Sequence, residues 1–113
     1  MLSVLELNAM ARSLLEDRAP DVWVEGEVRD LMRTGAGHVY FSLGDARAQV
    51  RCTMFRSDAI RVRFELADGL RIRVRGGLTV YEVRGTYQLN VRSVLAAGEG
   101  ERAAEIARIK KKL

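Results

Sequence analysis

The sequence predicts a mainly β domain with helices at its flanks, and three observations support this class. Five segments alternate apolar and polar residues with the two-residue period of half-buried strands. The beginning of the chain instead has a capping motif followed by apolar residues at helical spacing. The length of 113 residues suits one compact domain, and a second folded domain is not expected.

The chain opens with a predicted helix. Ser3 and Glu6 form a capping box, and apolar residues recur at helical spacing up to Arg18. Pro20 is the only proline; it ends this helix and leads into the alternating segment at residues 22–28, which is the first predicted strand.

Two further strands form a predicted hairpin. A glycine-containing turn at residues 34–37 precedes the second alternating segment at residues 38–43. The turn at residues 44–45 separates this segment from a third strand at residues 49–55.

The next segments are predicted to be a short helix and a long strand. Residues 57–66 lose the two-residue period, and Ser57 or Asp58 is placed to cap a helix there. A fourth strand at residues 70–81 contains a glycine pair, Gly76 and Gly77, where the strand is expected to bend or bulge.

The last strand completes an architecture that can be named. Residues 87–92 form the fifth strand, with Tyr87, Leu89 and Val91 predicted to point inward. Five strands with a helix between the third and fourth match the five-stranded OB-fold, a partly open Greek-key barrel. A half-open two-layer sandwich is the competing architecture, but the glycine pair in the fourth strand favours closure.

The domain boundary is expected near residue 98. Residues 1–98 are predicted to form the OB-fold domain together with its N-terminal helix. Residues 99–113 have helical apolar spacing and end in three lysines with no glycine stop. We expect them to begin a linker helix that continues in a longer parent chain.

Charge and cysteine content restrict the partners and the compartment. The formal net charge is +4, and sixteen arginines accompany only three lysines. Guanidinium groups fork onto phosphates and stack on bases, so this bias favours a nucleic-acid partner. The one cysteine, Cys52, permits no internal disulfide and favours a reducing cytoplasm with Cys52 as a buried hydrophobe. No apolar run predicts a signal peptide or a membrane span.

The sequence offers little catalytic machinery. His38 is the only histidine, and no serine or cysteine lies in a nucleophile motif. Glu25 and Glu27 share one face of the first strand, but arginines across the sheet explain them as well as a metal ion would. Trp23 is expected to pack against the first helix, because the neighbouring glutamates would repel a polyanion. We therefore expect no catalytic residue, metal or cofactor in this chain, which by itself is not predicted to be an enzyme.

Aromatic and cationic side chains interleave on the outer faces of the second and third strands, which is the face by which OB-folds bind ligands. Rings stack on bases and guanidinium groups contact phosphates, a combination suited to single-stranded nucleic acid. The candidate nucleic-acid-binding residues lie on these strands, on the fourth strand and in the adjoining loops. They are Arg33, His38, Tyr40, Arg51, Phe55, Arg56, Arg73, Arg75, Tyr81 and Arg84.

Other interpretations stay open at this point. Tyr40 or Phe55 is as well suited to packing under the helix of residues 57–66 as to stacking on a base, and a single arginine often does no more than solvate a face. The same barrel face would also serve as a scaffold that docks within an enzyme. An anticodon-type OB domain that reads a structured RNA loop is a third alternative.

Five runs of the sequence carry a resemblance to a known family, and they are residues 2–8, 21–28, 37–43, 48–56 and 81–89. These runs resemble the amino-terminal domain of a bacterial family, the exodeoxyribonuclease VII large subunit. The resemblance spans nearly the whole chain. Val83 departs from the family, which usually has proline before the Arg-Gly pair, so the loop is expected to differ in shape at this point.

The resemblance implies an OB-fold DNA-binding domain of an enzyme that degrades single-stranded DNA to oligonucleotides from both ends. In that family the hydrolytic site lies in a separate central domain, and a long helical region binds many copies of a small subunit. Neither region is part of this chain, and the resemblance implies that the helix expected at residues 99–113 begins the connection to the absent catalytic region. The expected partners are single-stranded DNA and, through the absent parts, the small subunit.

Overall fold

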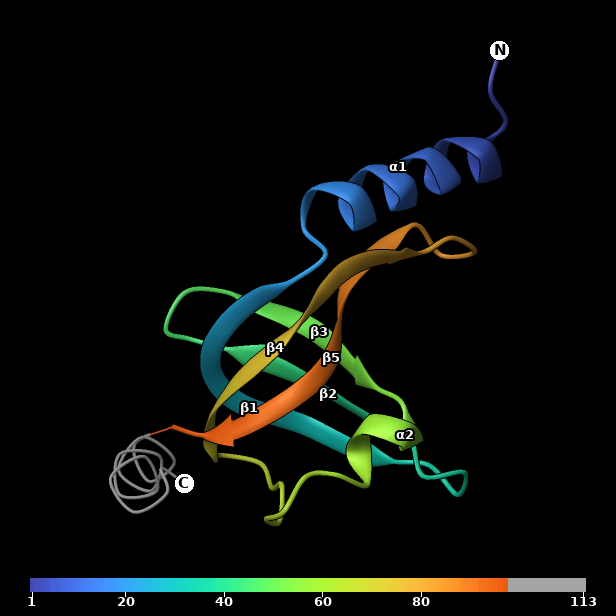
Figure 1. Cartoon of the computed structure of the whole chain (residues 1–113). Coiled ribbons are helices and arrows are strands. Elements are labelled where there is room, and N and C mark those ends of the chain that lie inside the picture. Colours follow the sequence, from blue (N-terminus) through green and yellow to red (C-terminus); the bar gives the residue numbers. More distant parts are fainter. Residues whose placement is uncertain (98–113) are drawn as a thin grey trace.

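The computed structural model describes residues 1–97, so the linker helix predicted for residues 99–113 lies outside the described residues. Within residues 1–97 the helices and strands follow the predicted order (Figure 1). The elements are α1 (Val4–Arg18), β1 (Val22–Arg33), β2 (Val39–Gly44), β3 (Gln49–Met54), α2 (Arg56–Ala59), β4 (Arg71–Tyr81) and β5 (Thr86–Ala96).

The strands close into a barrel in the order β1, β2, β3, β5, β4, and β4 pairs back onto β1. Neighbouring strands are antiparallel except for β3 and β5, which run parallel. The predicted five-stranded OB-fold is therefore confirmed. β1 is longer than predicted because its first half pairs with β4 and its second half with β2, and Asp30, at φ 54°, lies where the register of the second pairing shifts.

The barrel interior is filled by the apolar side of each predicted alternation. Val28, Phe41, Met54, Val74 and Leu89 have almost no exposed surface, although they come from five different strands. Strand residues alternate between the two faces of a sheet, so one correct period places every second side chain in the core. Most of the remaining strand positions face outward and are at least partly exposed, although Ser42 and Thr53 are buried.

Cys52 also lies in this core and is a free thiol. Burial raises the pKa of the Cys52 thiol to about 12, so the thiolate form is strongly disfavoured. The prediction that Cys52 serves as a small buried hydrophobe is confirmed.

The glycine pair in β4 lies where the strand changes register. The pairing of β4 with β5 shifts between Arg75 and Gly76, as expected for a bulge. At Gly76 the backbone of β5 approaches so closely that a Cβ atom would lie 2.9 Å from the Cα atom of Val91. The bend predicted from the sequence is thus confirmed, and its cause is close contact between two backbones.

The helix between β3 and β4 is shorter than predicted. α2 covers only Arg56–Ala59, and its N-cap is Phe55, which makes no side-chain capping bond, so capping by Ser57 or Asp58 was wrong. Residues 60–70 are mostly irregular, and Val62, Phe64 and Leu66 pack against the core from alternate positions. This segment contributes to the core in an extended form, and its local pattern was mistaken for a helix.

Two aromatic residues lie in different surroundings from those predicted. Trp23 is 54% exposed, and the guanidinium carbon of Arg75 lies 5.9 Å from the centre of its ring, whereas α1 packs against β4. Tyr87 was predicted to point into the core but is 57% exposed. It pairs with Val80 near the distal end of the β4–β5 hairpin, which extends beyond the barrel towards α1 (Figure 1).

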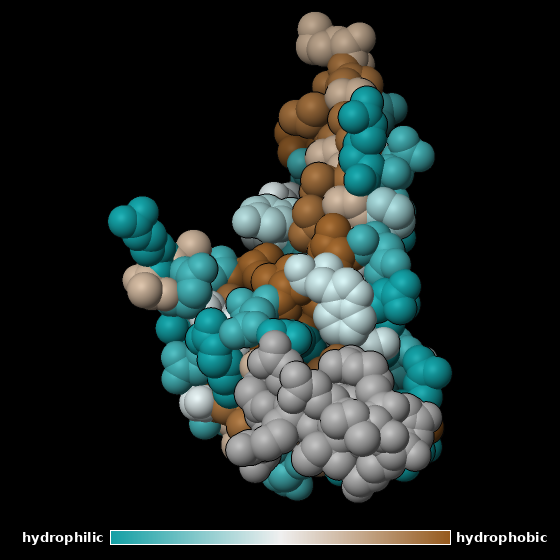
Figure 2. All heavy atoms as spheres, turned by 60° about the vertical axis from the view of Figure 1, so that its left-hand side comes forward, coloured by the Kyte–Doolittle hydropathy of each residue, from teal (hydrophilic) through white to brown (hydrophobic). Residues whose placement is uncertain are grey.

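α1 lies outside the barrel, alongside the β4–β5 hairpin (Figure 1). The predicted capping box is present: Ser3 and Glu6 each accept a hydrogen bond from the other's backbone N–H. No residue of α1 is buried, and Leu7, Met10 and Leu14 are about half exposed. Figure 2 shows such apolar side chains gathered along the surface of the helix. No helix in residues 1–97 is both long and apolar enough to cross a lipid bilayer.

Candidate nucleic-acid interface

The outer face of the β2–β3 hairpin carries the centre of the candidate interface. Tyr40 pairs with Thr53 across the two strands, and Ser42 pairs with Arg51. The Nη1 atom of Arg51 donates a hydrogen bond of 2.9 Å to the Oγ atom of Ser42. Because paired residues share a face, this register places the Tyr40 ring and the Arg51 guanidinium on the same outer surface.

His38, Phe55 and Arg56 extend this surface beyond the ends of the two strands. The rings of His38 and Phe55 meet edge to face with centroids 5.6 Å apart. The backbone N–H of Arg56 donates a 3.0 Å hydrogen bond to Nδ1 of His38, which fixes the orientation of the imidazole ring. Phe55 remains 44% exposed, so packing under a helix, the alternative considered for Phe55, does not occur.

The arginines of this surface differ from those of β4 in their partners. In the described part of the chain, Arg51 and Arg56 make no contact with a carboxylate. On the β1–β4 face, Arg75 makes a two-pronged ion pair with Asp21, at 2.8 Å and 2.7 Å. Positive charge is therefore available on the β2–β3 face, whereas on the β1–β4 face much of it is neutralised within the protein.

Glu25 completes this neutralisation. It accepts hydrogen bonds from Nε of Arg71 at 2.8 Å and from Nε of Arg73 at 3.0 Å. The explanation of Glu25 by arginines across the sheet is confirmed. Two of the candidate residues, Arg73 and Arg75, thus lie on a face separate from the Tyr40 surface and are engaged with carboxylates.

These ion pairs should make stability depend on pH. Hydrogen bonds from Arg75 lower the pKa of Asp21 below its ordinary 3.8, and those from Arg73 and Arg71 lower the pKa of Glu25 below 4.5. A carboxylate whose pKa is lower in the folded state stabilises the fold fully above its unfolded pKa and loses that effect as pH falls through the folded pKa. We expect the urea midpoint of unfolding to fall as the pH drops below about 4.5.

A double variant provides the control for this pH dependence. In Asp21→Asn/Glu25→Gln the fall in the urea midpoint below that pH should be shallower than in the original chain. Glu16 and Asp45 also have lowered pKa values, from hydrogen bonds with Thr79 and Arg12 and with the backbone of residues 47–48 respectively, so a residual slope should remain. An equally steep fall in the double variant would contradict the role given to the β1–β4 ion pairs.

The remaining candidates lie at the two loops that border the barrel face. Arg33, at the end of β1, donates a 2.8 Å hydrogen bond to the carbonyl of Leu66 and lies 3.5 Å from Glu65. Tyr81 ends β4, and Arg84 is exposed in the β4–β5 loop with no carboxylate partner among residues 1–97. Figure 1 shows the β1–β2 and β4–β5 loops at opposite ends of the barrel.

The structure thus brings five of the ten candidates together and separates the others. His38, Tyr40, Arg51, Phe55 and Arg56 form one continuous set on and beside the β2–β3 hairpin, which we call the hairpin surface. Sequence reasoning missed Ser42, which is 1% exposed and accepts the hydrogen bond that orients Arg51. Its position opposite Arg51 follows from the hairpin register once the turn is placed.

Solved structures with the same architecture come from different kinds of protein. A chain of a replication protein A heterotrimer bound to single-stranded DNA superposes with a TM-score of 0.54 and 16% identity, covering 80% of this chain and 73% of that one. Asparaginyl-tRNA synthetase from Pyrococcus horikoshii superposes with a TM-score of 0.57 and 17% identity, covering 74% of this chain and 21% of that one. At these identities the likeness establishes the fold alone.

Curated proteins provide the closer sequence relationships. Exodeoxyribonuclease 7 large subunits are 50% identical over all 113 residues in Pseudomonas aeruginosa (strain LESB58), and 49% identical in Azotobacter vinelandii (strain DJ). The chain covers 25% of the length of each of these relatives. The resemblance inferred from the sequence is therefore confirmed.

A family model agrees with both the fold and these relatives. Residues 2–95 match the model described as OB-fold nucleic acid binding domain, which takes in every helix and strand described above except the last residue of β5. The chain therefore belongs to the family of OB-fold nucleic acid binding domains, in the form found in exodeoxyribonuclease 7 large subunits.

Proposed function

We propose that this chain binds single-stranded DNA as the substrate-binding domain of an exodeoxyribonuclease VII large subunit. The observation that carries the proposal is the composition of the hairpin surface. It combines exposed or partly exposed rings with two arginines that have no carboxylate partner in residues 1–97. Bases would stack on Tyr40 and Phe55, while Arg51 and Arg56 contact the phosphates between them.

The chemistry of this surface favours an unpaired strand over a duplex. The faces of bases in a duplex are covered by their stacked neighbours. Aromatic rings on the surface of a barrel can therefore stack on the faces of bases only in a single strand. The β1–β4 face lacks this combination, because Arg75 is held by Asp21 and the Trp23 ring lies beside that ion pair. A polyanion would be directed to the hairpin surface.

The wider role is what the family resemblance implies, and the relatives named exodeoxyribonuclease 7 large subunit support it. In the proposed parent enzyme, single-stranded DNA is degraded to oligonucleotides by a catalytic region outside this chain, and the small subunit is bound by other parts of the large subunit. This domain would supply affinity for the substrate and would need no metal or cofactor for binding. A buried thiol at Cys52 and a DNA substrate both fit a cytoplasmic enzyme.

Binding should be strongly dependent on salt and sensitive to one arginine in particular. Fluorescence anisotropy with a labelled oligothymidylate is expected to show binding at low salt that weakens as salt rises from about 50 to 200 mM. Arg51→Gln should weaken binding about fivefold at low salt and reduce the slope of log Kd against log salt by about 0.7, the value for one phosphate contact on a single strand.

The matched control is Arg75→Gln, which removes the same charge from the β1–β4 face. It should leave the affinity for oligothymidylate within about twofold of the original chain, because Asp21 already engages that guanidinium. Equal losses from both substitutions would mean that DNA senses only net charge. No binding at low salt, together with retention of a protein partner at high salt, would contradict the proposal and favour a docking scaffold.

A further inference from the structure

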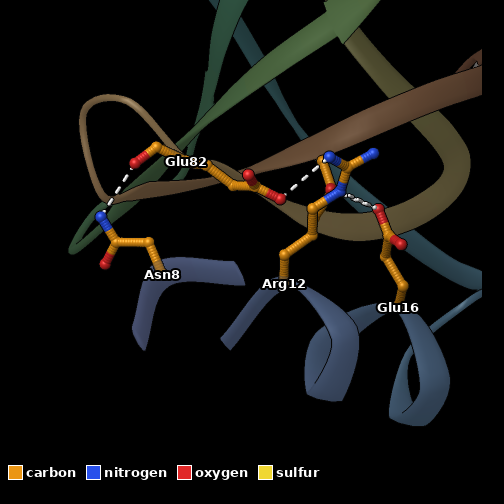
Figure 3. A network of polar contacts seen from close by, with 5 residues as sticks. Asn8, Arg12, Glu16 and Glu82 are labelled. Carbon is orange, nitrogen blue, oxygen red and sulfur yellow. Dashed lines mark hydrogen bonds and ion pairs between the residues drawn. The ribbon is translucent and has the colours of Figure 1, made fainter. Parts of the chain in front are cut away.

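The β4–β5 loop is held by α1 through a polar network (Figure 3). The side-chain amide of Asn8 donates a 2.8 Å hydrogen bond to the backbone carbonyl of Glu82, and Nη1 of Arg12 lies 3.1 Å from the carboxylate of the same residue. Arg12 also contacts Glu16 at 2.9 Å, and Glu16 accepts a 2.6 Å hydrogen bond from the hydroxyl of Thr79 on β4. α1 thus contacts both the loop and the strand that leads into it.

Few other interactions hold α1 in position against the barrel. α1 has no buried residue, so little apolar burial orients it against the barrel. Hydrogen bonds from Thr79 and Arg12 lower the pKa of Glu16, and contacts with Glu16 and Glu82 raise the pKa of Arg12, so both groups are charged at neutral pH. At the other end of the helix the backbone N–H of Leu78 donates a 2.9 Å hydrogen bond to the carbonyl of Ala19, which attaches the C-cap of α1 to β4. The network therefore holds the part of α1 that lies beside the loop.

The loop itself is a tight turn with an exposed tip. The backbone N–H groups of Arg84 and Gly85 both donate to the carbonyl of Tyr81, at 3.1 Å and 2.8 Å. Gly85 has φ +72°, and a Cβ atom there would lie 3.1 Å from the amide nitrogen of Asn8. Glu82 is held by α1, so the next two residues, Val83 and Arg84, are the ones that project into solvent.

We propose that α1 is a brace that positions the β4–β5 loop, so that Asn8 and Arg12 act as positioning residues for a contact between Arg84 and single-stranded DNA. This inference rests on the proposed function and extends it to a helix outside the barrel. The β4–β5 loop is one of the walls of the ligand groove in OB-folds, and a wall residue contributes only when its loop is held in place. Neither Asn8 nor Arg12 needs to touch DNA.

The test combines two variants of the brace with one variant of the loop. Asn8→Ala removes the amide contact at a position where alanine favours the helix, so α1 itself should not be weakened. Arg12→Gln is matched by Arg18→Gln, which removes the same charge from α1 at a side chain with no hydrogen bond or ion pair in the described part of the chain. Arg84→Gln is made in the original chain and in the Asn8→Ala/Arg12→Gln background.

Two measurements decide the proposal. Arg84→Gln should weaken oligothymidylate binding about threefold in the original chain and by less than about 1.5-fold in the double variant, since contacts that depend on each other are not additive. Amide hydrogen exchange in residues 82–85 should accelerate in the double variant but not in Arg18→Gln. Arg12→Lys keeps a cation beside Glu82. It should therefore behave like the original chain both in the effect of Arg84→Gln on binding and in hydrogen exchange of residues 82–85.

The failures of this proposal and of the proposed function are distinguishable. Additive effects of Arg84→Gln in both backgrounds, or unchanged exchange in residues 82–85, would overturn the brace. A silent Arg84→Gln in the original chain would also overturn it, because the loop would then have no contact with DNA to position. None of these results bears on DNA binding by the hairpin surface, which Arg51→Gln tests separately.

Discussion

Replacing Gly76 with alanine is expected to lower the free energy of unfolding by about 3 kcal/mol, the upper part of the usual range for overpacking. The added Cβ atom would lie 2.8 Å from the carbonyl carbon of Asn90 and 2.9 Å from the Cα atom of Val91. Both neighbours are backbone atoms of β5, which cannot rotate away as a side chain would. The strands must separate at the bulge, where β4 turns from its pairing with the first half of β1 towards the protruding hairpin.

Chemical denaturation with urea measures this effect, and Gly35→Ala is its matched control. At Gly35 an added Cβ atom would have no neighbour within 4 Å, and the backbone is not left-handed, so alanine there should leave stability within about 0.5 kcal/mol or raise it slightly. A Gly76→Ala protein that unfolds at the same urea concentration as the original chain would show that β4 and β5 can separate at little cost. The slope of free energy against urea should stay constant in both variants.

The barrel was predictable because each strand has one buried face. A two-residue period in residues 38–43 and 49–55 specifies which side chains share a face, and in the structure Phe41 and Cys52, from the apolar side of each strand, pair within the core. The glycine pair in β4 was informative for a related reason. A long strand in a small barrel must bend, and residues without Cβ atoms are needed where backbones approach.

The wrong predictions concern residues for which the sequence pattern gives the direction of a side chain but not the part of the protein that it meets. Tyr87 does follow the alternation of β5, but alternation does not reveal that the hairpin extends past the end of the core. Trp23 was assigned to α1 because the neighbouring glutamates would repel a polyanion, whereas α1 lies against β4 and the Trp23 ring lies beside Arg75. Residues 60–66 pack against the core without regular structure, and no local rule identifies such a segment.

In the candidate site, too, local contacts were predictable from the sequence and contacts between distant segments were not. Tyr40 and Arg51 share a face because hairpin register is local, and the sequence predicted this correctly. The carboxylate partners of Arg73 and Arg75 depend on which strand lies beside β4. Only the closed barrel shows that this strand is β1. The contact of Asn8 with the β4–β5 loop joins residues 74 positions apart in the sequence, so no sequence pattern could have indicated it.

Removing both rings from the hairpin surface should have the largest effect on DNA binding. Tyr40→Ala/Phe55→Ala is expected to weaken the affinity for oligothymidylate by about 100-fold, since each stacked base contributes about 1–3 kcal/mol and two are lost. The salt dependence should be nearly unchanged, because the phosphate contacts of Arg51 and Arg56 remain. Fluorescence anisotropy across a salt series measures both quantities in one experiment.

Trp23→Ala is the matched control for this variant, because it removes an exposed ring from the β1–β4 face, 54% exposed against 44% for Phe55. It should leave DNA binding within about twofold of the original chain, as no base is expected to stack beside the Arg75–Asp21 pair. The reverse outcome, a large loss from Trp23→Ala and a small one from the double variant, would place the DNA on the β1–β4 face. The DNA strand would then have to displace Asp21 and Glu25 from their arginines, and protonation of these carboxylates at low pH would strengthen binding. A site on the hairpin surface, where Arg51 and Arg56 have no carboxylate partner in residues 1–97, requires no such displacement.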